Sequence, residues 1–478
     1  MTDRSAGESA GERIARAMLE LRTDDLPAAV LLAGIERILD TVGVAVAAIG
    51  DPAADSVAAA ALATDNGGDV PVWGRGTSAS ARTAALVNGT AAHALDFDDS
   101  LFSSIMHAGA VVVPTALAVA AQHPVSGHDL LAAIACGYQV ADLLGRQTPG
   151  VFQAHGFQPS AVLGVFAGVV TAARLRGLDT TTALHAIGLA GSMSSGLMEF
   201  LDAGGHGKPL QVGWAAQSAL FAVDLALAGA EGPATVLEGR YGIFRSFARS
   251  ELPADLDVWS DHAILRVATK PYPVCHGIHD PADLWRDTIA ELRARGIDPV
   301  SDVAELTCVV SAFTVRLTLD PIEVKRRPAT PHQARFSLPY CLARIALDGT
   351  LGNDAFTPEA IRDPYAARFA DHVTYEVDED GVLPGTTRTR LRLRTADGTV
   401  VERELHRNRD ARTGLFGPDD LRAKFTRNLV GRTGPAAAER GLAAAAALYD
   451  SDDTAPILAW LASDAAGPGV DAHRSVSS

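Results

Sequence analysis

The densest group of reactive side chains is Asp96-Phe-Asp-Asp-Ser100, which follows an apolar helical stretch and precedes His107 by seven residues. Carboxylates this close repel one another, which can raise a carboxyl pKa toward the range of a general base. Three interpretations are open: a solvated helix end, a Mg²⁺ site, or a catalytic carboxylate with a nearby histidine. A Mg²⁺ site of the D-D-x-x-D type lacks its third aspartate, because Phe102 and Ser103 follow the acidic pair.

Lysine is rare in this chain, since only four of the 41 basic residues are lysines: Lys208, Lys270, Lys325 and Lys424. Lys208 lies in the glycine-rich segment 202–210, which we predict to be a loop between two apolar helices. A loop lysine is usually solvated, but glycines let a ligand approach the backbone closely. An ammonium group can donate to a carboxylate or exchange a proton with it, so Lys208 is a candidate catalytic residue.

Three further histidines are candidates, two of them close together in the chain. His276 and His279 are three residues apart, a spacing that a helix would bring to one face and that could suggest a metal. Pro271 and Pro273 indicate an extended start to this segment, and no third ligand is adjacent. A packed or capping pair and acid–base work are the alternatives, and His155 is a further candidate.

Composition excludes several classes of protein. The net charge is 41 − 57 = −16 and no long basic stripe offsets it, so we expect no nucleic-acid or membrane partner. The four cysteines form no C-x-x-C pair, which argues against a disulfide framework, a zinc ribbon or an iron–sulfur site. Motifs for nucleotide binding, a serine-nucleophile elbow and an H-E-x-x-H zinc site are missing as well, so a nucleotide cofactor is not indicated, and we expect no metal.

The chain also lacks the pattern of a signal peptide. Its longest uncharged apolar run, 108–121, contains Pro114 and is too short to span a bilayer. We therefore expect a cytoplasmic protein.

Hydrophobic periodicity predicts helix after helix up to about residue 250. The predicted helices are 26–49, with a cap near Asp25 and Pro27 in the first turn, then 79–96, 112–122, 129–144, 160–176, 181–200 and 212–230. After Lys270, alternating or β-branched segments predict strands over 306–319, 373–377, 389–394 and 399–405, with a hairpin at 396–398. Helices are predicted again over 336–347, 418–425 and 436–448.

The predicted fold class is mainly α with a smaller α/β domain. A large all-helical domain spans 1–267 and 410–466 and is completed by the C-terminal helices. A lid-like α+β domain is inserted over 268–409, and a Gly/Ser-rich tail, 467–478, is expected to be disordered.

Several segments in the same order resemble the MmgE/PrpD family, which includes 2-methylcitrate dehydratase, cis-aconitate decarboxylase and iminodisuccinate epimerase. They are Asn88-Gly-Thr-Ala-Ala-His-Ala-Leu-Asp-Phe-Asp-Asp-Ser100, His107-Ala-Gly109, Gly156-Phe-Gln-Pro-Ser160, Gly207-Lys-Pro-Leu-Gln-Val-Gly-Trp-Ala-Ala216, Leu237-Glu-Gly-Arg-Tyr-Gly242 and Lys270-Pro-Tyr-Pro273. The resemblance covers roughly residues 10 to 430.

The resemblance implies a homodimer of two-domain subunits, a site between the domains, no cofactor and a small anionic carboxylate substrate. The residues that match the family's catalytic positions are Asp96, His107, Lys208 and His279. The expected substrate-binding positions are Ser100, His155, Gln158, His276 and Tyr340.

Two positions depart from the family pattern. Gln158 stands in Phe-Gln-Pro where decarboxylase and dehydratase relatives usually have Phe-His-Pro, and an amide cannot shuttle a proton at neutral pH. His107 is followed by Ala-Gly, where methylcitrate dehydratases commonly have Pro-Ser.

The family's reactions share a carbanion next to a carboxylate, which needs a placed base and cations to stabilise the developing charge. We expect Asp96 or a histidine to handle the C–H proton, and Lys208 to grip a carboxylate or serve as the opposing acid. A dehydratase or decarboxylase-type lyase is the first hypothesis and an epimerase of a dicarboxylate such as iminodisuccinate is the second. A non-catalytic carboxylate-binding paralogue is the alternative from another class.

Overall fold

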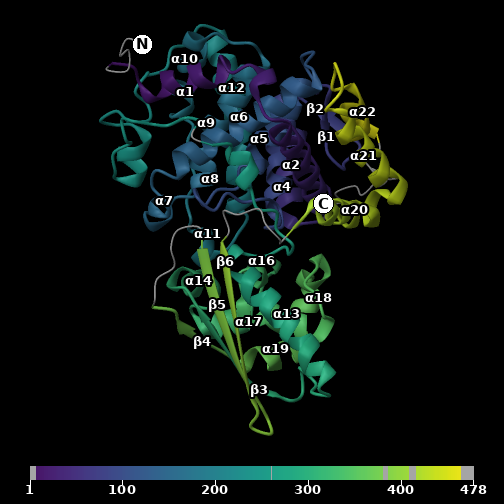
Figure 1. The fold of residues 1–478 in the computed structure, drawn as a ribbon. Helices are drawn as coiled ribbons and strands as arrows, with labels where there is room; N and C mark the ends of the chain where they lie inside the picture. The colour runs from purple at the N-terminus through teal and green to yellow at the C-terminus, as the bar shows by residue number, and fades with distance from the viewer. Residues whose placement is uncertain (1–6, 260, 380–385, 409–415, 464–478) are drawn as a thin grey trace, which may run out of the picture. The chain divides into compact units, whose positions relative to one another are not determined.

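The computed structural model describes residues 7–259, 261–379, 386–408 and 416–463, so the predicted tail 467–478 lies outside the described residues. The chain divides into two compact units. The larger comprises the described residues of 1–94, 98–269 and 412–478, and the smaller those of 95–97 and 270–411. Figure 1 labels most of their helices and strands.

The larger unit is built mainly from α-helices. Its helices are α1 (Ala10–Leu19), α2 (Ala28–Ala47), α3 (Pro52–Ala63), α4 (Ala81–Ala94), α5 (Gly109–Ala120), α6 (Gly127–Gly145), α7 (Val151–Ala154), α8 (Pro159–Val162), α9 (Gly164–Leu175), α10 (Thr180–Ala190), α11 (Phe200–Ala203), α12 (Gly207–Leu227), α20 (Pro418–Thr433), α21 (Pro435–Ala447) and α22 (Ala455–Ser463). A two-stranded antiparallel ribbon, β1 (Val70–Val72) and β2 (Thr77–Ala79), is an addition that the hydrophobic pattern did not predict.

Helix α5 lies at the centre of this unit. Every residue from Gly109 to Ala120 is buried, including Pro114 inside the helix, and α4, α6, α9 and α12 pack around it. The apolar run noted in the sequence is therefore the central core helix of the unit, where burial of apolar surface is the main stabilising term.

Helix α12 is long and apolar enough to cross a membrane by length and composition alone, and 56% of its most apolar window is buried in the unit. Its packing against α4, α9 and α10 accounts for that composition, because a buried core helix passes the same test.

Helices α4 and α12 approach so closely that their backbones touch at two glycines. A Cβ atom on Gly89 would lie 3.0 Å from the Cα of Gly213, and one on Gly213 would lie 2.3 Å from the carbonyl oxygen of Leu86. Nearer the start of α4, Arg82 stacks over the ring of Phe221. These pairs, 89 with 213 and 82 with 221, define an antiparallel crossing. Extended along both helices, it places the first turn of α12 beside the last turn of α4.

The smaller unit carries a four-stranded mixed sheet in the order β4-β3-β5-β6. Strand β3 (Val303–Val310) is parallel to β4 (Val373–Val377), and β5 (Thr386–Thr395) is antiparallel to both β3 and β6 (Val400–Asn408). Helix α13 (His279–Ala294) packs against β5 and β6 and against α17 (Leu338–Asp348), which also contacts α19 (Pro364–Asp371). Four shorter helices are α14 (Ala312–Thr318), α15 (Ile322–Arg326), α16 (Pro331–Arg335) and α18 (Pro358–Ile361).

The predicted fold class is confirmed, whereas several predicted bounds are wrong. The strand predicted over 306–319 ends at Val310, because the Ser311 hydroxyl accepts from the backbone N–H of Thr314 and starts α14. The helix predicted over 181–200 ends at Ala190. The predicted cap near Asp25 is also wrong, since Asp25 lies in a 3₁₀ turn and Pro27 is the residue before α2.

The glycine contact between α4 and α12 generates a stability prediction. Gly213→Ala would force a methyl group against the Leu86 carbonyl, and we expect a loss of about 1–3 kcal/mol, which is a fall in Tm of several degrees. Gly207→Ala is the matched control, because its Cβ would meet only the Gln211 amide nitrogen, at 3.6 Å. Alanine is the better helix former, so the control should hold or raise Tm in the same thermal melt. Equal Tm values for the two variants would contradict the close crossing.

Candidate functional site

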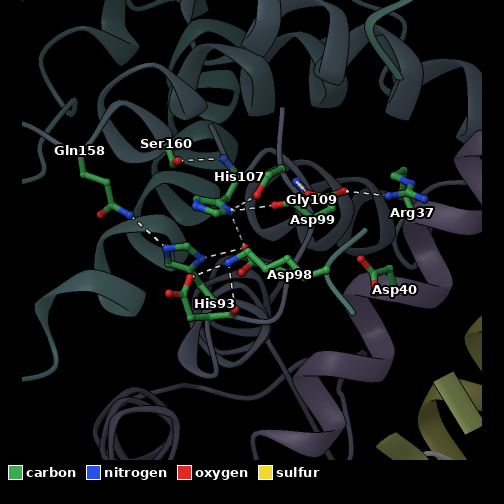
Figure 2. Close-up of polar contacts among 12 residues, drawn as sticks. Arg37, Asp40, His93, Asp98, Asp99, His107, Gly109, Gln158 and Ser160 are labelled. Atoms are coloured by element: carbon green, nitrogen blue, oxygen red, sulfur yellow. Dashed lines mark hydrogen bonds and ion pairs between the residues drawn. The ribbon is translucent and has the colours of Figure 1, made fainter. Parts of the chain in front are cut away.

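A buried histidine–carboxylate pair stands at the end of α4. His93 is 1% exposed, and its Nδ1 lies 2.8 Å from Oδ2 of the fully buried Asp98. The other ring nitrogen, Nε2, lies 3.0 Å from the amide Nε2 of Gln158. Figure 2 marks this contact with a dashed line. Because an ionised carboxylate only accepts hydrogen bonds, His93 Nδ1 is the donor to Asp98. In the neutral ring Nε2 is then an acceptor, and Gln158 donates to it.

His107 lies beside this pair and is held by three neighbours. Its Nδ1 donates to the Asp99 backbone carbonyl at 2.8 Å and lies 3.1 Å from the Ser100 hydroxyl. Its backbone N–H donates to the Ser160 hydroxyl at 2.9 Å, and its ring centroid is 5.0 Å from that of His93. A carbonyl oxygen can only accept, so in the neutral ring Nδ1 carries the proton and Nε2 is the basic nitrogen.

The carboxylate of Asp99 anchors the loop that carries Asp98, Ser100 and His107. It accepts from the Tyr138 hydroxyl on α6 and, at 3.2 Å, from the backbone N–H of Gly109. The Arg37 guanidinium on α2 lies 3.6 Å away. Burial raises the pKa of Asp99 to about 6, although the positive charge of Arg37 and the Tyr138 hydrogen bond act in the opposite direction.

This anchor explains why glycine follows His107-Ala. A Cβ atom on Gly109 would lie 2.7 Å from the Tyr138 hydroxyl and 2.8 Å from the Thr41 hydroxyl. A serine at this position, as in the Pro-Ser of methylcitrate dehydratases, would need these groups to move. The close packing around Asp99 therefore explains why this chain has glycine and not serine at position 109.

Lys208 lies in the first turn of α12, so the prediction of a loop position is wrong. Proline is tolerated in a first helical turn, where its missing N–H has no intrahelical partner, and the helix therefore begins at Gly207 instead of after Pro209. The side chain is buried, with 7% of the residue exposed. The antiparallel crossing of α4 and α12 places this turn at the same end as His93.

A second connection brings the Lys208 turn toward Gln158. The backbone N–H of Gln158 donates to the carbonyl of Gly196, and the side chain of Gln211, three residues after Lys208, donates to the carbonyl of Leu197 at 2.8 Å. The strand-like segment around Gly196 therefore lies between Gln158 and the start of α12. His93, His107, Gln158 and Lys208 all belong to this end of the larger unit.

Four predicted site residues belong to the smaller unit. Asp96 has a left-handed backbone, φ 51°, and its carboxylate and carbonyl accept from the Lys270 ammonium at 2.7 and 2.9 Å. The rings of His276 and His279 are 5.2 Å apart, because the 3₁₀ turn His276–Ile278 leads directly into α13. Tyr340 is 2% exposed and donates its hydroxyl to the Ala355 carbonyl, which is a contact within the core of this unit.

His155 ends α7, and the structure puts Gln158, not His155, against His93. The roles of all nine predicted residues stay predictions.

A metal would fit this cluster only after rearrangement. One ligand atom each from His93, Asp98 and His107 lies within 4.8 Å of the others. However, both histidine Nδ1 atoms act as hydrogen-bond donors, and a nitrogen that carries a proton cannot bind a metal ion. The arrangement is a hydrogen-bonded cluster, and its chemistry is that of proton transfer and hydrogen bonding.

Several residues at these sites were missed as functional positions. His93 belongs to the Asn88–Ser100 motif, but it lies within the predicted helix 79–96 and is not among the candidate site residues. The spacing of five residues between His93 and Asp98 was a usable signal, because a helix end followed by a turn can fold back onto itself. Lys270, as the partner of Asp96, and Arg37 and Tyr138, as partners of Asp99, carried no such signal because they are distant in the chain.

The chain matches the sequence models of a known protein family over both of its units. The sequence model of the MmgE/PrpD N-terminal domain matches residues 12–254, and that of the C-terminal domain matches residues 272–450. The chain belongs to the MmgE/PrpD family, as the motifs predicted.

Among its relatives is a cis-aconitate decarboxylase of Mus musculus, 26% identical over 438 residues, which are 88% of this chain and 87% of that protein. The cis-aconitate decarboxylase of Homo sapiens is 29% identical over 314 residues, 63% of this chain and 62% of that protein. That of Aspergillus terreus is 29% identical over 282 residues, 55% of this chain and 56% of that protein.

The Asp99 anchor generates a prediction about pH. Tyr138→Phe removes a hydrogen bond that favours the ionised carboxylate, so the pKa of Asp99 should rise further above about 6. A carboxyl whose pKa is higher in the folded state stabilises the fold below its unfolded pKa, and this stabilisation is lost as pH rises through the folded pKa. The Tm deficit of Tyr138→Phe against the wild type should therefore grow between pH 5 and pH 8.

Tyr340→Phe is the matched control for this melt series, because its hydroxyl donates to a carbonyl that does not titrate. Its Tm deficit should stay constant over the same pH range. A constant deficit for Tyr138→Phe would show that Asp99 does not titrate there.

Proposed function

We propose that this protein is a cofactor-independent lyase that acts on a small di- or tricarboxylate through proton transfer at a carbon next to a carboxylate. The observation that carries the proposal is the fixed tautomer of His107, whose Nδ1 donates to the Asp99 carbonyl. Its Nε2 is thereby the basic nitrogen, on a side chain that is 18% exposed. A base with a set orientation and partial access is what abstraction of a C–H proton requires.

Lys208 supplies the positive charge that such a reaction needs. A proton next to a carboxylate is removed only if the developing enediolate is stabilised, and an ammonium group can do this by charge and hydrogen bonding. Lys208 stands in the first turn of the 21-residue helix α12, where the helix dipole adds positive potential. In a chain of net charge −16, this end of the larger unit is suited to hold a carboxylate.

The proposed reactions share the carbanion but differ in how it forms. In dehydration and epimerisation a base removes the C–H proton, whereas in decarboxylation the electron pair of the C–C bond stays on carbon as CO₂ leaves. When a hydroxyl stands on the neighbouring carbon, its C–O bond breaks, hydroxide leaves as water after protonation, and an alkene remains. In decarboxylation, the C–C bond to a carboxylate breaks, CO₂ leaves, and the carbanion takes up a proton. The relatives named cis-aconitate decarboxylases support a lyase.

A second candidate is epimerisation, in which the carbanion is reprotonated on the opposite face. The observation that favours it is Gln158 beside His93, where decarboxylase and dehydratase relatives usually have a histidine. An amide cannot transfer a proton at neutral pH, so a lyase would lack one proton-transfer group here.

Proton NMR in D₂O separates these reactions. The full-length protein is incubated with 2-methylcitrate, citrate, cis-aconitate and iminodisuccinate in turn. New alkene signals or loss of CO₂ support the lyase, and deuterium exchange without net product supports the epimerase. Neither exchange nor turnover with any of the four would overturn the proposed function in favour of a carboxylate-binding protein.

Substitution of the lysine tests its part in this reaction. Lys208→Met keeps most of the side-chain volume and removes the charge, and we expect kcat/KM to fall by about 10²-fold or more. Lys325→Met is the matched control, since Lys325 lies on α15 of the smaller unit and its ammonium donates to the Leu317 carbonyl. The control should keep turnover within about twofold of the wild type. Near-normal turnover in Lys208→Met would remove this lysine from the mechanism.

A further inference from the structure

We infer that Gln158 determines specificity by accepting a hydrogen bond from a hydroxyl or amine on the ligand, so that the site prefers hydroxy- or amino-polycarboxylates to polycarboxylates without such a donor. The inference rests on the proposed function, because it assumes a carboxylate ligand at the His93 end of the larger unit. It concerns which carboxylates bind there, and not which bond breaks.

The first step is the orientation of the Gln158 amide. Asp98 compels His93 to carry its proton on Nδ1, so Nε2 of the neutral ring is an acceptor. Only the NH₂ group of Gln158 can satisfy that acceptor, and its Nε2 lies 3.0 Å away, as Figure 2 shows. The pair of buried residues therefore fixes which end of the amide is available to a ligand, and that end is the carbonyl oxygen.

The second step is the state of that oxygen. Gln158 is 5% exposed, and its Oε1 is buried with no hydrogen-bond partner within residues 7–259, 261–379, 386–408 and 416–463. A buried acceptor without a donor loses its hydrogen bond to water and gains none in return, which is why native proteins leave few of them. A ligand that brings a donor to this oxygen restores that hydrogen bond.

The third step is the surroundings of Gln158. Gln211, one turn after Lys208, donates its Nε2 to the Leu197 carbonyl, and its own buried Oε1 has no partner in the described part of the chain. A Cβ atom on Gly196 would lie 3.3 Å from that Gln211 oxygen and 3.4 Å from the backbone carbonyl oxygen of Gln158, so the two glutamines flank Gly196. Buried amide acceptors thus stand at the end of the unit that carries the Lys208 ammonium. Such a set suits a ligand with both carboxylates and a donor.

The same geometry disfavours an ionised carboxylate directly against Gln158. Both groups are acceptors at neutral pH, so their approach leaves two lone-pair-bearing oxygens facing each other without a proton. A histidine at this position could donate a hydrogen bond to a carboxylate, whereas the oriented glutamine cannot. With glutamine in place of histidine at position 158, the protein therefore offers the ligand a hydrogen-bond acceptor instead of a donor.

The test compares ligands that differ only in the donor, by isothermal titration of the wild-type protein at pH 7.5. Citrate has a hydroxyl that tricarballylate lacks, and malate and aspartate add a hydroxyl or an ammonium to succinate. We expect citrate to bind about tenfold more tightly than tricarballylate, which is the worth of one hydrogen bond to a buried acceptor. The malate and aspartate arms show whether a hydroxyl or an amine is the better donor.

Gln158→Met removes the contact, because methionine keeps the length of the side chain but lacks the amide, both the oxygen that would accept from the ligand and the NH₂ that donates to His93. Its citrate-to-tricarballylate ratio should fall to within about twofold of unity. Gln147→Met is the matched control, since Gln147 lies after α6 and donates to the Leu143 carbonyl, and it should keep the wild-type ratio.

Equal binding of citrate and tricarballylate by the wild type would overturn the inference, and so would an unchanged ratio in Gln158→Met. Failure of all five acids to bind would overturn it as well. The comparison of citrate with tricarballylate uses the wild-type protein. It therefore tests the inference even if Gln158→Met does not fold. None of these results depends on turnover, and the NMR assay decides the proposed function separately.

Discussion

The buried carboxylate of Asp99 is the constraint on which the rest of the site depends. It gathers a guanidinium from α2, a hydroxyl from α6 and the first backbone N–H of α5, three elements that are far apart in the sequence. A carboxylate without these partners would be too costly to bury, and the partners without the carboxylate would be left unsatisfied. The loop that carries Asp98 and His107 is therefore held in one conformation, and the tautomer of His107 follows from the Asp99 carbonyl.

Glycines allow the close packing around the Asp99 carboxylate and between the helices nearby. Glycine at 109 makes space for the Tyr138 hydroxyl, and the contact between Gly89 and Gly213 lets α4 and α12 pack backbone against backbone. A close antiparallel crossing aligns the last turn of one helix with the first turn of the other. His93 and Lys208, 115 residues apart in the sequence, come to the same end of the unit for that reason.

The rare lysines share a physical pattern that their sequence positions alone did not show. Lys270 and Lys424 are each 1% exposed and paired with an aspartate, Asp96 in the smaller unit and Asp40 in the larger. Lys208 is also buried, at the start of a long helix. A compact ammonium in a buried site is costly unless it is paired. Three of the four lysines are buried, and the aspartate partners of two of them, Lys270 and Lys424, offset this cost.

The family, the fold class and most of the elements could be predicted from the sequence. Hydrophobic periodicity and local caps are short-range properties, so segments such as 373–377 and 129–144 could be predicted nearly to their ends. The motif around residues 88–100 likewise marked where reactive groups gather. These inferences need only neighbours along the chain.

The contacts among those groups could not be predicted from the sequence, because they come from the tertiary structure. The direction of the Gln158 amide depends on a hydrogen bond to His93, 65 residues earlier, and that ring depends in turn on Asp98. The burial of Lys208 and the partners of Asp99 likewise come from packing between distant helices. Proton positions and hydrogen-bond polarity are set by atoms within about 3 Å in space, and no spacing along the chain encodes that neighbourhood.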